Sequence, residues 1–177
     1  MTLKERSDLG VGSRAAAPSQ PLFHRVLKAE PVIVRDTLQD VRQRFRHEIS
    51  EDTMGRLELV LAEVMNNVAE HAGPEGTWTI DKSGRSPKKV SRPVIHLCIV
   101  RHNSGLACAL TDDGNSLPAE CLLPRGLPSM APEDLPEGGF GWFLIQDLTQ
   151  ALCYYREESR NYLAFSIPFA QPDLTGA

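Results

Sequence analysis

Three groups of residues in this 177-residue chain are of types that can bind or react with a ligand. The first lies in the stretch Leu57–Ala72 (LELVLAEVMNNVAEHA), where Glu63, Asn67 and His71 recur at four-residue steps. In a helix these side chains stack above one another, so a carboxylate, a carboxamide and an imidazole would share one stripe at the core boundary. A solvated helix edge can carry the same residue types, and the stripe taken alone favours that simpler interpretation.

The second group is Asp112-Asp113-Gly114, which directly follows a hydrophobic strand. A carboxylate at this point can accept a hydrogen bond from the exocyclic amine of a base. A glycine two positions later allows a ligand to approach the backbone closely. The alternative is an ordinary Asp-Gly turn, which would be the better interpretation if the motif stood alone.

The third group is Gly138-Gly139-Phe140-Gly141, which opens a predicted helix. Bare backbone N–H groups and the positive end of the helix dipole form a natural cradle for phosphate. A glycine-rich turn is also a common joint between a loop and a helix, so this motif is weak by itself. It is not a Walker loop, because the required Gly-Lys-Ser/Thr is missing.

Hydrophobic periodicity predicts the elements that must position these groups. The central helix has apolar residues at three- and four-residue steps, and it is expected to begin after the cap Ser50 and to stop at Gly73-Pro74. A strand at 22–29 and a helix at 31–49 precede it. The rest of the pattern predicts strands at 76–81, 93–102 and 106–111, a loop at 82–92, a helix at 140–150, and strands at 152–158 and 162–168 that turn at Ser159-Arg160-Asn161.

Composition limits the class of protein. The hydrophobic fraction of 41% and the charged fraction of 24% are those of a globular protein, and the length suits one domain. The net charge of −4 gives no basic patch for nucleic acid, and no apolar run is long enough to cross a membrane. The four cysteines, at 98, 108, 121 and 153, lack zinc-site spacing and are expected to be reduced thiols. With no signal peptide, we expect a cytoplasmic protein.

The expected organisation is a disordered lead at residues 1–20, followed by a single domain at 21–170. Within that domain the stretch 115–137 has little apolar periodicity and five prolines. A structureless segment of this length inside a domain is typical of a lid, a binding loop or a disordered segment, and we predict a lid at 115–137.

Taken in order, the three motifs resemble the ATP-binding domain of the GHKL superfamily, which includes gyrase, histidine kinases and MutL. The stretch AEVMNNVAEHA is similar to the N box, TDDGNSLP to the first glycine box and EGGFGWFLIQDL to the second. The resemblance covers about residues 20 to 168. It implies the Bergerat-type ATP-binding fold, an α/β (α+β) two-layer sandwich in which about three helices cover one face of a mixed, mostly antiparallel sheet.

The small size and the N-x-x-x-H and G-G-x-G-W-F-L-I patterns most resemble bacterial anti-sigma-factor serine kinases of the RsbW kind. This resemblance implies an ATP-binding serine/threonine protein kinase that acts as a regulatory switch. Its partners would be a small antagonist (STAS-like) protein, which it phosphorylates on a serine, and a sigma factor. A homodimer is implied by the resemblance only, with contacts through the first helix and the nearby sheet edge. The cofactors implied are ATP and Mg²⁺.

The resemblance also assigns roles on the N box. Asn67 would be the metal residue, ligating Mg²⁺ through its amide oxygen. Glu63, one turn earlier, would be catalytic and would activate the acceptor hydroxyl as a general base. His71 would have a structural or ATP-pocket role.

The two glycine boxes would hold the nucleotide. Asp112 would bind the adenine amine, and Gly114 would lie beneath the ring. The glycines of the second box, Gly138, Gly139 and Gly141, would offer backbone donors to the phosphates.

The sequence departs from the family at the phosphate end. Relatives often have Arg inside the G-G-x-G run, where this chain has Phe140, and Glu137 lies just before it. Arg125 is the only basic residue between the two glycine boxes, so it is the candidate catalytic cation. Nucleotide binding is therefore better supported than efficient phosphoryl transfer. One alternative is a nucleotide-gated binding module without catalysis, and another is a detached ATPase domain that serves a phosphorelay.

Overall fold

A five-stranded sheet forms the frame of the protein in a computed structural model that describes residues 22–71, 91–118, 121 and 140–169, with the backbone of 78–80 and 87–89. The strand order is β1-β4-β5-β7-β6. Every pairing in it is antiparallel. The strands are β1 (Leu22–Lys28), β4 (Val94–His102), β5 (Gly105–Asp112), β6 (Gln150–Glu157) and β7 (Arg160–Pro168).

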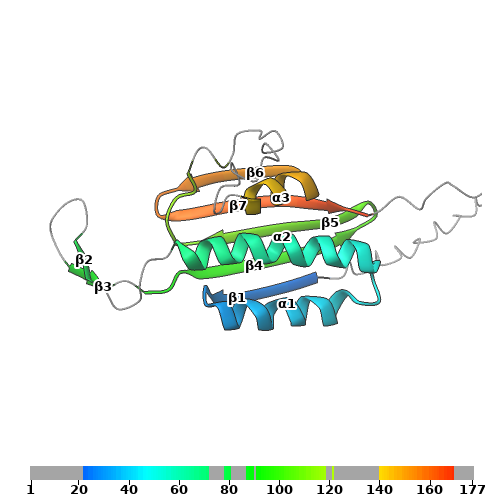
Figure 1. The fold of residues 1–177 in the computed structure, drawn as a ribbon, viewed down its shortest axis with the longest axis horizontal. Helices are drawn as coiled ribbons and strands as arrows, with labels where there is room; N and C mark the ends of the chain where they lie inside the picture. The colour runs from blue at the N-terminus through cyan, green and yellow to red at the C-terminus, as the bar shows by residue number, and fades with distance from the viewer. Residues whose placement is uncertain are drawn as a thin grey trace, which may run out of the picture.

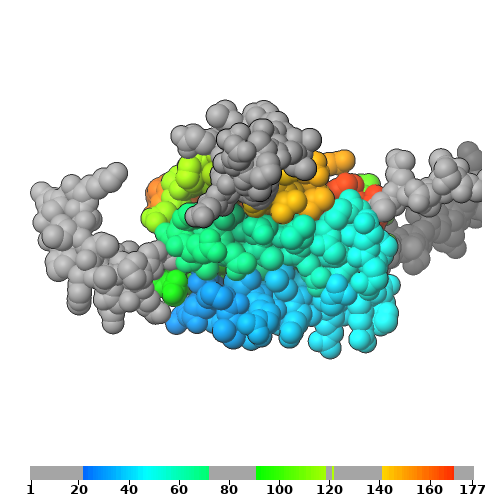
Figure 2. Space-filling view, viewed as in Figure 1, coloured from blue at the N-terminus to red at the C-terminus, as the bar shows by residue number. Residues whose placement is uncertain are grey.

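Three helices cover one face of this sheet (Figure 1): α1 (Pro31–Phe45), α2 (Glu51–Glu70) and α3 (Phe140–Leu148). Figure 2 shows this helical face, with α1 and α2 packed side by side. The expected two-layer α+β sandwich is confirmed. We predicted a mixed, mostly antiparallel sheet, and all the pairings of the five-stranded sheet are antiparallel.

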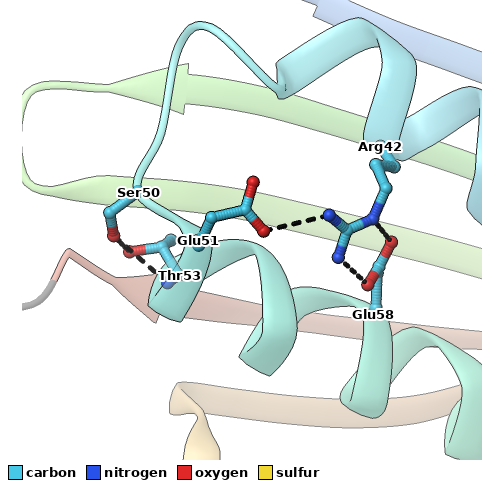
Figure 3. Close-up of polar contacts among 5 residues, drawn as sticks. All are labelled: Arg42, Ser50, Glu51, Thr53 and Glu58. Carbon is cyan, nitrogen blue, oxygen red and sulfur yellow. Dashed lines mark hydrogen bonds and ion pairs between the residues drawn. The ribbon is translucent and has the colours of Figure 1, made fainter.

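Helix α2 carries the centre of the core, as its sequence pattern predicts. Ser50 is its N-cap and accepts a hydrogen bond from the backbone N–H of Thr53 at 3.2 Å (Figure 3). The apolar face packs on alternating residues of β4 and β5, so the core lies between helix and sheet. The fully buried residues of this layer include Leu57, Leu61, Met65, Ile95, Leu97, Ile99, Leu106 and Leu110.

An ion-pair cluster joins the two long helices (Figure 3). The Arg42 guanidinium donates to both carboxylate oxygens of Glu58 at 2.7 Å and to Glu51 at 3.0 Å. These hydrogen bonds, the one to Glu58 foremost, raise the pKa of Arg42 above its usual value. The cluster is exposed, so it fixes how α1 lies along α2 more than it adds to stability.

Several predicted boundaries were wrong. Helix α1 ends at Phe45 and not at residue 49, because a turn follows in which the Glu48 N–H bonds three residues back, to the Phe45 carbonyl, at 2.8 Å. The stretch expected as a loop at 82–92 contains β3 (Pro87–Lys89), which pairs with β2 (Trp78–Ile80).

The last hairpin turns earlier than predicted. Glu157 pairs with Arg160, and Glu158 takes up the left-handed conformation, with φ at 51°, that closes this turn. Asn161 therefore lies inside β7 and is buried, not in the turn where we placed it.

Two further expectations concern the thiols and the membrane. All four cysteines are free, in agreement with the expectation of reduced thiols. Among the described helices, none combines the length and the apolar character that crossing a bilayer requires. The predicted helix stop at Gly73-Pro74 and the predicted lead at 1–20 lie outside the described residues.

Candidate functional site

A cavity of about 200 Å³ opens near the C-terminal end of α2. Its walls come from α2, the end of β5 with the segment that follows it, α3, and the last two strands. Its lining is mostly apolar with a few polar groups, which is typical of a ligand site. The polar residues of this wall are Asn67, His71, Asp112, Asn115, Ser116, Tyr154 and Asn161.

Asp112 is the carboxylate of the cavity and is only 6% exposed. Its Oδ1 accepts hydrogen bonds from the Gly114 N–H and from Asn161 Nδ2, both at 2.8 Å. Burial raises the pKa of Asp112 above its ordinary value, while the two hydrogen bonds oppose that rise. Asp112 thus combines a fixed position with a charge that the surroundings only partly stabilise.

Gly114 is required by the closeness of its neighbours. A Cβ at this position would lie 2.9 Å from Asp112 Oδ1 and 3.3 Å from Pro93 Cγ. The first contact is shorter than real Cβ atoms tolerate, so a side chain would displace the carboxylate. The glycine therefore serves the position of Asp112, in addition to the role beneath a base that the resemblance assigns to it.

Asn161 is a site residue that our sequence analysis missed. It is 4% exposed and lies directly opposite Asp112 in the pairing of β5 with β7. One signal could have found it: Asn161 keeps the two-residue alternation of Leu163, Phe165 and Ile167, which places it on the core face of the strand. The polar run Ser-Arg-Asn hid that alternation.

His71 follows α2 as its C-cap and contributes to the cavity wall. Its backbone carbonyl accepts a hydrogen bond from Asn115 Nδ2. The end of the helix is thereby tied to the segment after β5, which includes the start of the predicted lid.

Asn67 lines the cavity together with Trp142 of α3, and Glu63 lies one turn earlier on α2, beside the cavity. A Cβ built on Gly141 would overlap the Glu63 carboxylate, so the first turn of α3 lies directly against this side chain. Asn67 lies one turn further along α2, and its Nδ2 is buried without a hydrogen-bond partner among the described residues. A buried polar atom without a partner is rare and suggests a missing ligand.

The remaining predicted site residues are not described. Gly138, Gly139 and Arg125 lie outside the described residues, as does Glu137. Of the rest, Asn67, His71 and Asp112 line one cavity, Gly114 bonds to Asp112, and Glu63 and Gly141 lie against each other beside it.

A comparison with protein-family models decides the family. The model described as "Histidine kinase-like ATPase domain" matches residues 27–167, from the end of β1 into β7. The chain belongs to the histidine kinase-like ATPase family. The superfamily that the motifs resemble is thus confirmed, whereas the anti-sigma subfamily stays a prediction.

Two other comparisons complete this result. Among solved structures, the catalytic domain of the histidine kinase ThkA matches with 13% sequence identity and a TM-score of 0.38, covering 82% of this chain and 97% of that one. The search of curated proteins gave no match.

An ATPase domain of this family binds ATP, and ATP-dependent phosphoryl transfer is the chemistry it implies. Mg²⁺ would accompany the nucleotide. The described residues hold no cluster of three or more His, Cys, Asp or Glu side chains suited to a metal. Mg²⁺ needs no such cluster, because it usually takes one or two protein oxygens together with phosphates and water. The amide oxygen of Asn67 is a ligand of that kind, whereas the buried Nδ2, a donor without a described partner, suits a phosphate oxygen.

Proposed function

We propose that this histidine kinase-like ATPase domain is a serine/threonine protein kinase and an anti-sigma-type regulatory switch. It transfers the γ-phosphoryl group of ATP to a serine of a small STAS-like antagonist protein. The observation that carries the proposal is the contact of Glu63 with the start of α3. A carboxylate that can take a proton lies beside the helix N-terminus where the phosphates would be held.

Each end of the cavity has a part in this reaction. Asp112 and Gly114 would receive the adenine, and Asn67 would hold Mg²⁺, which would supply neutralisation of phosphate charge. Glu63 accepts the proton of the serine hydroxyl while the serine oxygen forms a bond to the γ-phosphorus. The bond from that phosphorus to the bridging oxygen breaks, and ADP leaves. Arg125 is the proposed cation near the transferred group.

The partner proposals rest on the resemblance to RsbW-like kinases. A homodimer through α1 and the edge strand β1 is supported by three exposed apolar side chains in that region. They are Leu22 at 54%, Val26 at 51% and Val32 at 61% exposure. Leu22 and Val26 share one face of β1, and large apolar residues exposed together are typical of interaction sites. Light scattering on the full chain tests the dimer, and Val26→Asp with Val32→Asp should yield the monomer mass.

The kinase proposal is tested by incubating the full chain with γ-labelled ATP, Mg²⁺ and a panel of bacterial STAS-domain antagonists. We expect label on a serine of one antagonist, located by mass spectrometry, and ADP in equal amount. ATP binding without transfer to any antagonist would overturn the kinase half of the proposal.

A second candidate function is a nucleotide-gated binding module with little or no catalysis. Phe140, where relatives often have a cation, favours it, because a side chain without charge cannot neutralise the transferring phosphoryl group. In that case Glu63→Gln would leave both ATP-dependent partner binding and cellular output unchanged.

A further inference from the structure

The carboxamide of Asn161 uses all of its hydrogen-bonding positions. Its Nδ2 donates to Asp112 Oδ1 at 2.8 Å and to the Asn115 carbonyl at 2.9 Å. Its Oδ1 accepts from the Tyr154 hydroxyl at 2.9 Å and from Arg156 Nη1 at 2.5 Å. A carboxamide offers two donors and two acceptor sites, so none is left over.

Because all four hydrogen-bonding positions are occupied, only one orientation of the Asn161 amide is allowed. Rotating it by half a turn would place its oxygen against two acceptors, Asp112 Oδ1 and the Asn115 carbonyl. The nitrogen would then face the cationic Arg156, which has only donors. Only the Tyr154 hydroxyl could still bond to the rotated amide, as an acceptor, so the buried group would lose three of its four hydrogen bonds, at a large cost in stability.

The same bonds determine what Asp112 presents to the cavity. Oδ1 already accepts two hydrogen bonds, from Asn161 and from the Gly114 N–H. Oδ2 accepts none from a described residue, so it is the oxygen left for a ligand. Because both partners of Oδ1 are donors, Oδ1 must stay an acceptor, and any proton taken up by the carboxyl group goes to Oδ2.

We propose that Asn161 is the positioning residue that determines base selectivity, by holding Asp112 so that Oδ2 accepts a hydrogen bond from an exocyclic amine. The inference rests on the proposed function, in that the cavity is taken to receive the base of a nucleotide. A base with an oxo group in place of the amine would bring an acceptor against an acceptor and would be rejected.

Asn161 has this effect because burial disfavours the charged form of Asp112. Burial raises the pKa of the carboxyl group, and Asp113 acts in the same direction. Asn161, the Gly114 N–H and Arg156 act against it, and His71 faces the same cavity from α2. Without the Asn161 donor, the carboxyl group would be freer to rotate and to take up a proton, and a protonated Oδ2 would donate to an oxo base.

The test compares ATP with inosine triphosphate, which has an oxo group where ATP has its amine. Dissociation constants are measured by calorimetry on the full chain with Mg²⁺. We expect the natural protein to prefer ATP by about tenfold or more, the effect of one hydrogen bond to a charged group. Asn161→Leu should bring the two constants within about threefold of each other, and Asn161→Thr, which keeps one donor, should restore part of the preference.

Tyr154→Phe is the matched control. It removes a bond to Asn161 Oδ1 and the 3.0 Å bond from the Leu117 N–H, but it leaves the donors to Asp112 in place. This variant should bind both ATP and inosine triphosphate more weakly, and the ratio of the two dissociation constants should stay the same. If Asn161→Leu bound both nucleotides more weakly by the same factor, the ratio of their dissociation constants would be unchanged. That result would overturn the inference and leave Asn161 a merely structural role.

The natural protein provides a measurement that does not depend on folding of a variant. As pH falls through the raised pKa of Asp112, the preference for ATP should decline, because ATP affinity falls while inosine triphosphate affinity does not. If the affinities for ATP and inosine triphosphate changed with pH in parallel, the inference would be overturned. If neither nucleotide binds, the proposed function itself fails and the inference fails with it.

Discussion

The two ends of the cavity differ in how far the protein itself satisfies their polar groups. At the end that we propose receives the base, Asp112 Oδ1 and the whole Asn161 carboxamide have hydrogen-bond partners. At the end that we propose receives the phosphates, Asn67 Nδ2 is buried without a partner among the described residues, and no described hydrogen bond or ion pair engages Glu63 beside the cavity. In the proposed function, the base end is organised before a ligand arrives, and the ligand completes the phosphate end.

This contrast has an energetic consequence. A buried polar group without a partner costs about 1–3 kcal/mol, and a ligand that supplies the partner recovers part of that cost. A phosphate oxygen that accepts a hydrogen bond from Asn67 Nδ2 should therefore contribute to stabilisation by nucleotide, while the proposed base end mainly decides which nucleotide binds.

The largest effect should come from Glu63→Gln at the phosphate end. If Glu63 takes the proton of the serine hydroxyl, the glutamine variant should transfer phosphoryl about 10²- to 10⁴-fold more slowly. ATP affinity should change little, because the side chain keeps its shape beside α3. Single-turnover transfer and calorimetry measure the two quantities. An unchanged transfer rate would remove Glu63 from the chemistry.

Asp112→Asn should act at the base end, on binding. It replaces the charged acceptor Oδ2 with a group that holds an amine less strongly, and we expect ATP affinity to fall about tenfold to 100-fold. Calorimetric titration with ATP and Mg²⁺ measures the loss. An affinity like that of the natural protein would show that the base lies elsewhere.

Gly141→Ala should slow transfer with little loss of stability. The added Cβ pushes the end of the Glu63 side chain away from α3, and a displacement of this size should reduce the transfer rate about tenfold. Gly55→Ala in the same helix as Glu63 is the control, since a Cβ there meets nothing within 4 Å. It should raise the free energy of unfolding by about 0.5–1 kcal/mol and leave transfer unchanged. Equal transfer rates in the two variants would contradict the placement of Glu63.

The smallest effect should be the pH dependence of ATP binding. The pKa of Asp112 is raised on folding, so its contribution to stability is present below the unfolded-state pKa and is lost as pH rises through the folded-state pKa. ATP favours the ionised form of Asp112, so the affinity for ATP should rise as pH rises through the folded-state pKa of Asp112, by up to about tenfold per pH unit. Binding should release a proton, which calorimetry in buffers of different ionisation enthalpy detects. No proton release in that range would mean that Asp112 is already ionised in the free protein.

Much of the architecture could be read from the sequence because it depends on local patterns. The three- and four-residue period of α2, its Ser50 cap and the alternation in β4 each lie within one short stretch, and the structure has all three. The pairing of β2 with β3 was missed, since three residues are too few to show a period.

The sequence by itself determined the helices and strands that carry the motifs, and the family to which those motifs belong. Only the tertiary structure decided that Asn161 holds Asp112, although 49 residues separate them. They meet because β5 and β7 pair in a register that places them opposite each other, and a shift of that register by one residue would turn Asn161 to the other face of the sheet. A polar side chain far along the chain acquires its role from strand pairing, which no local pattern specifies.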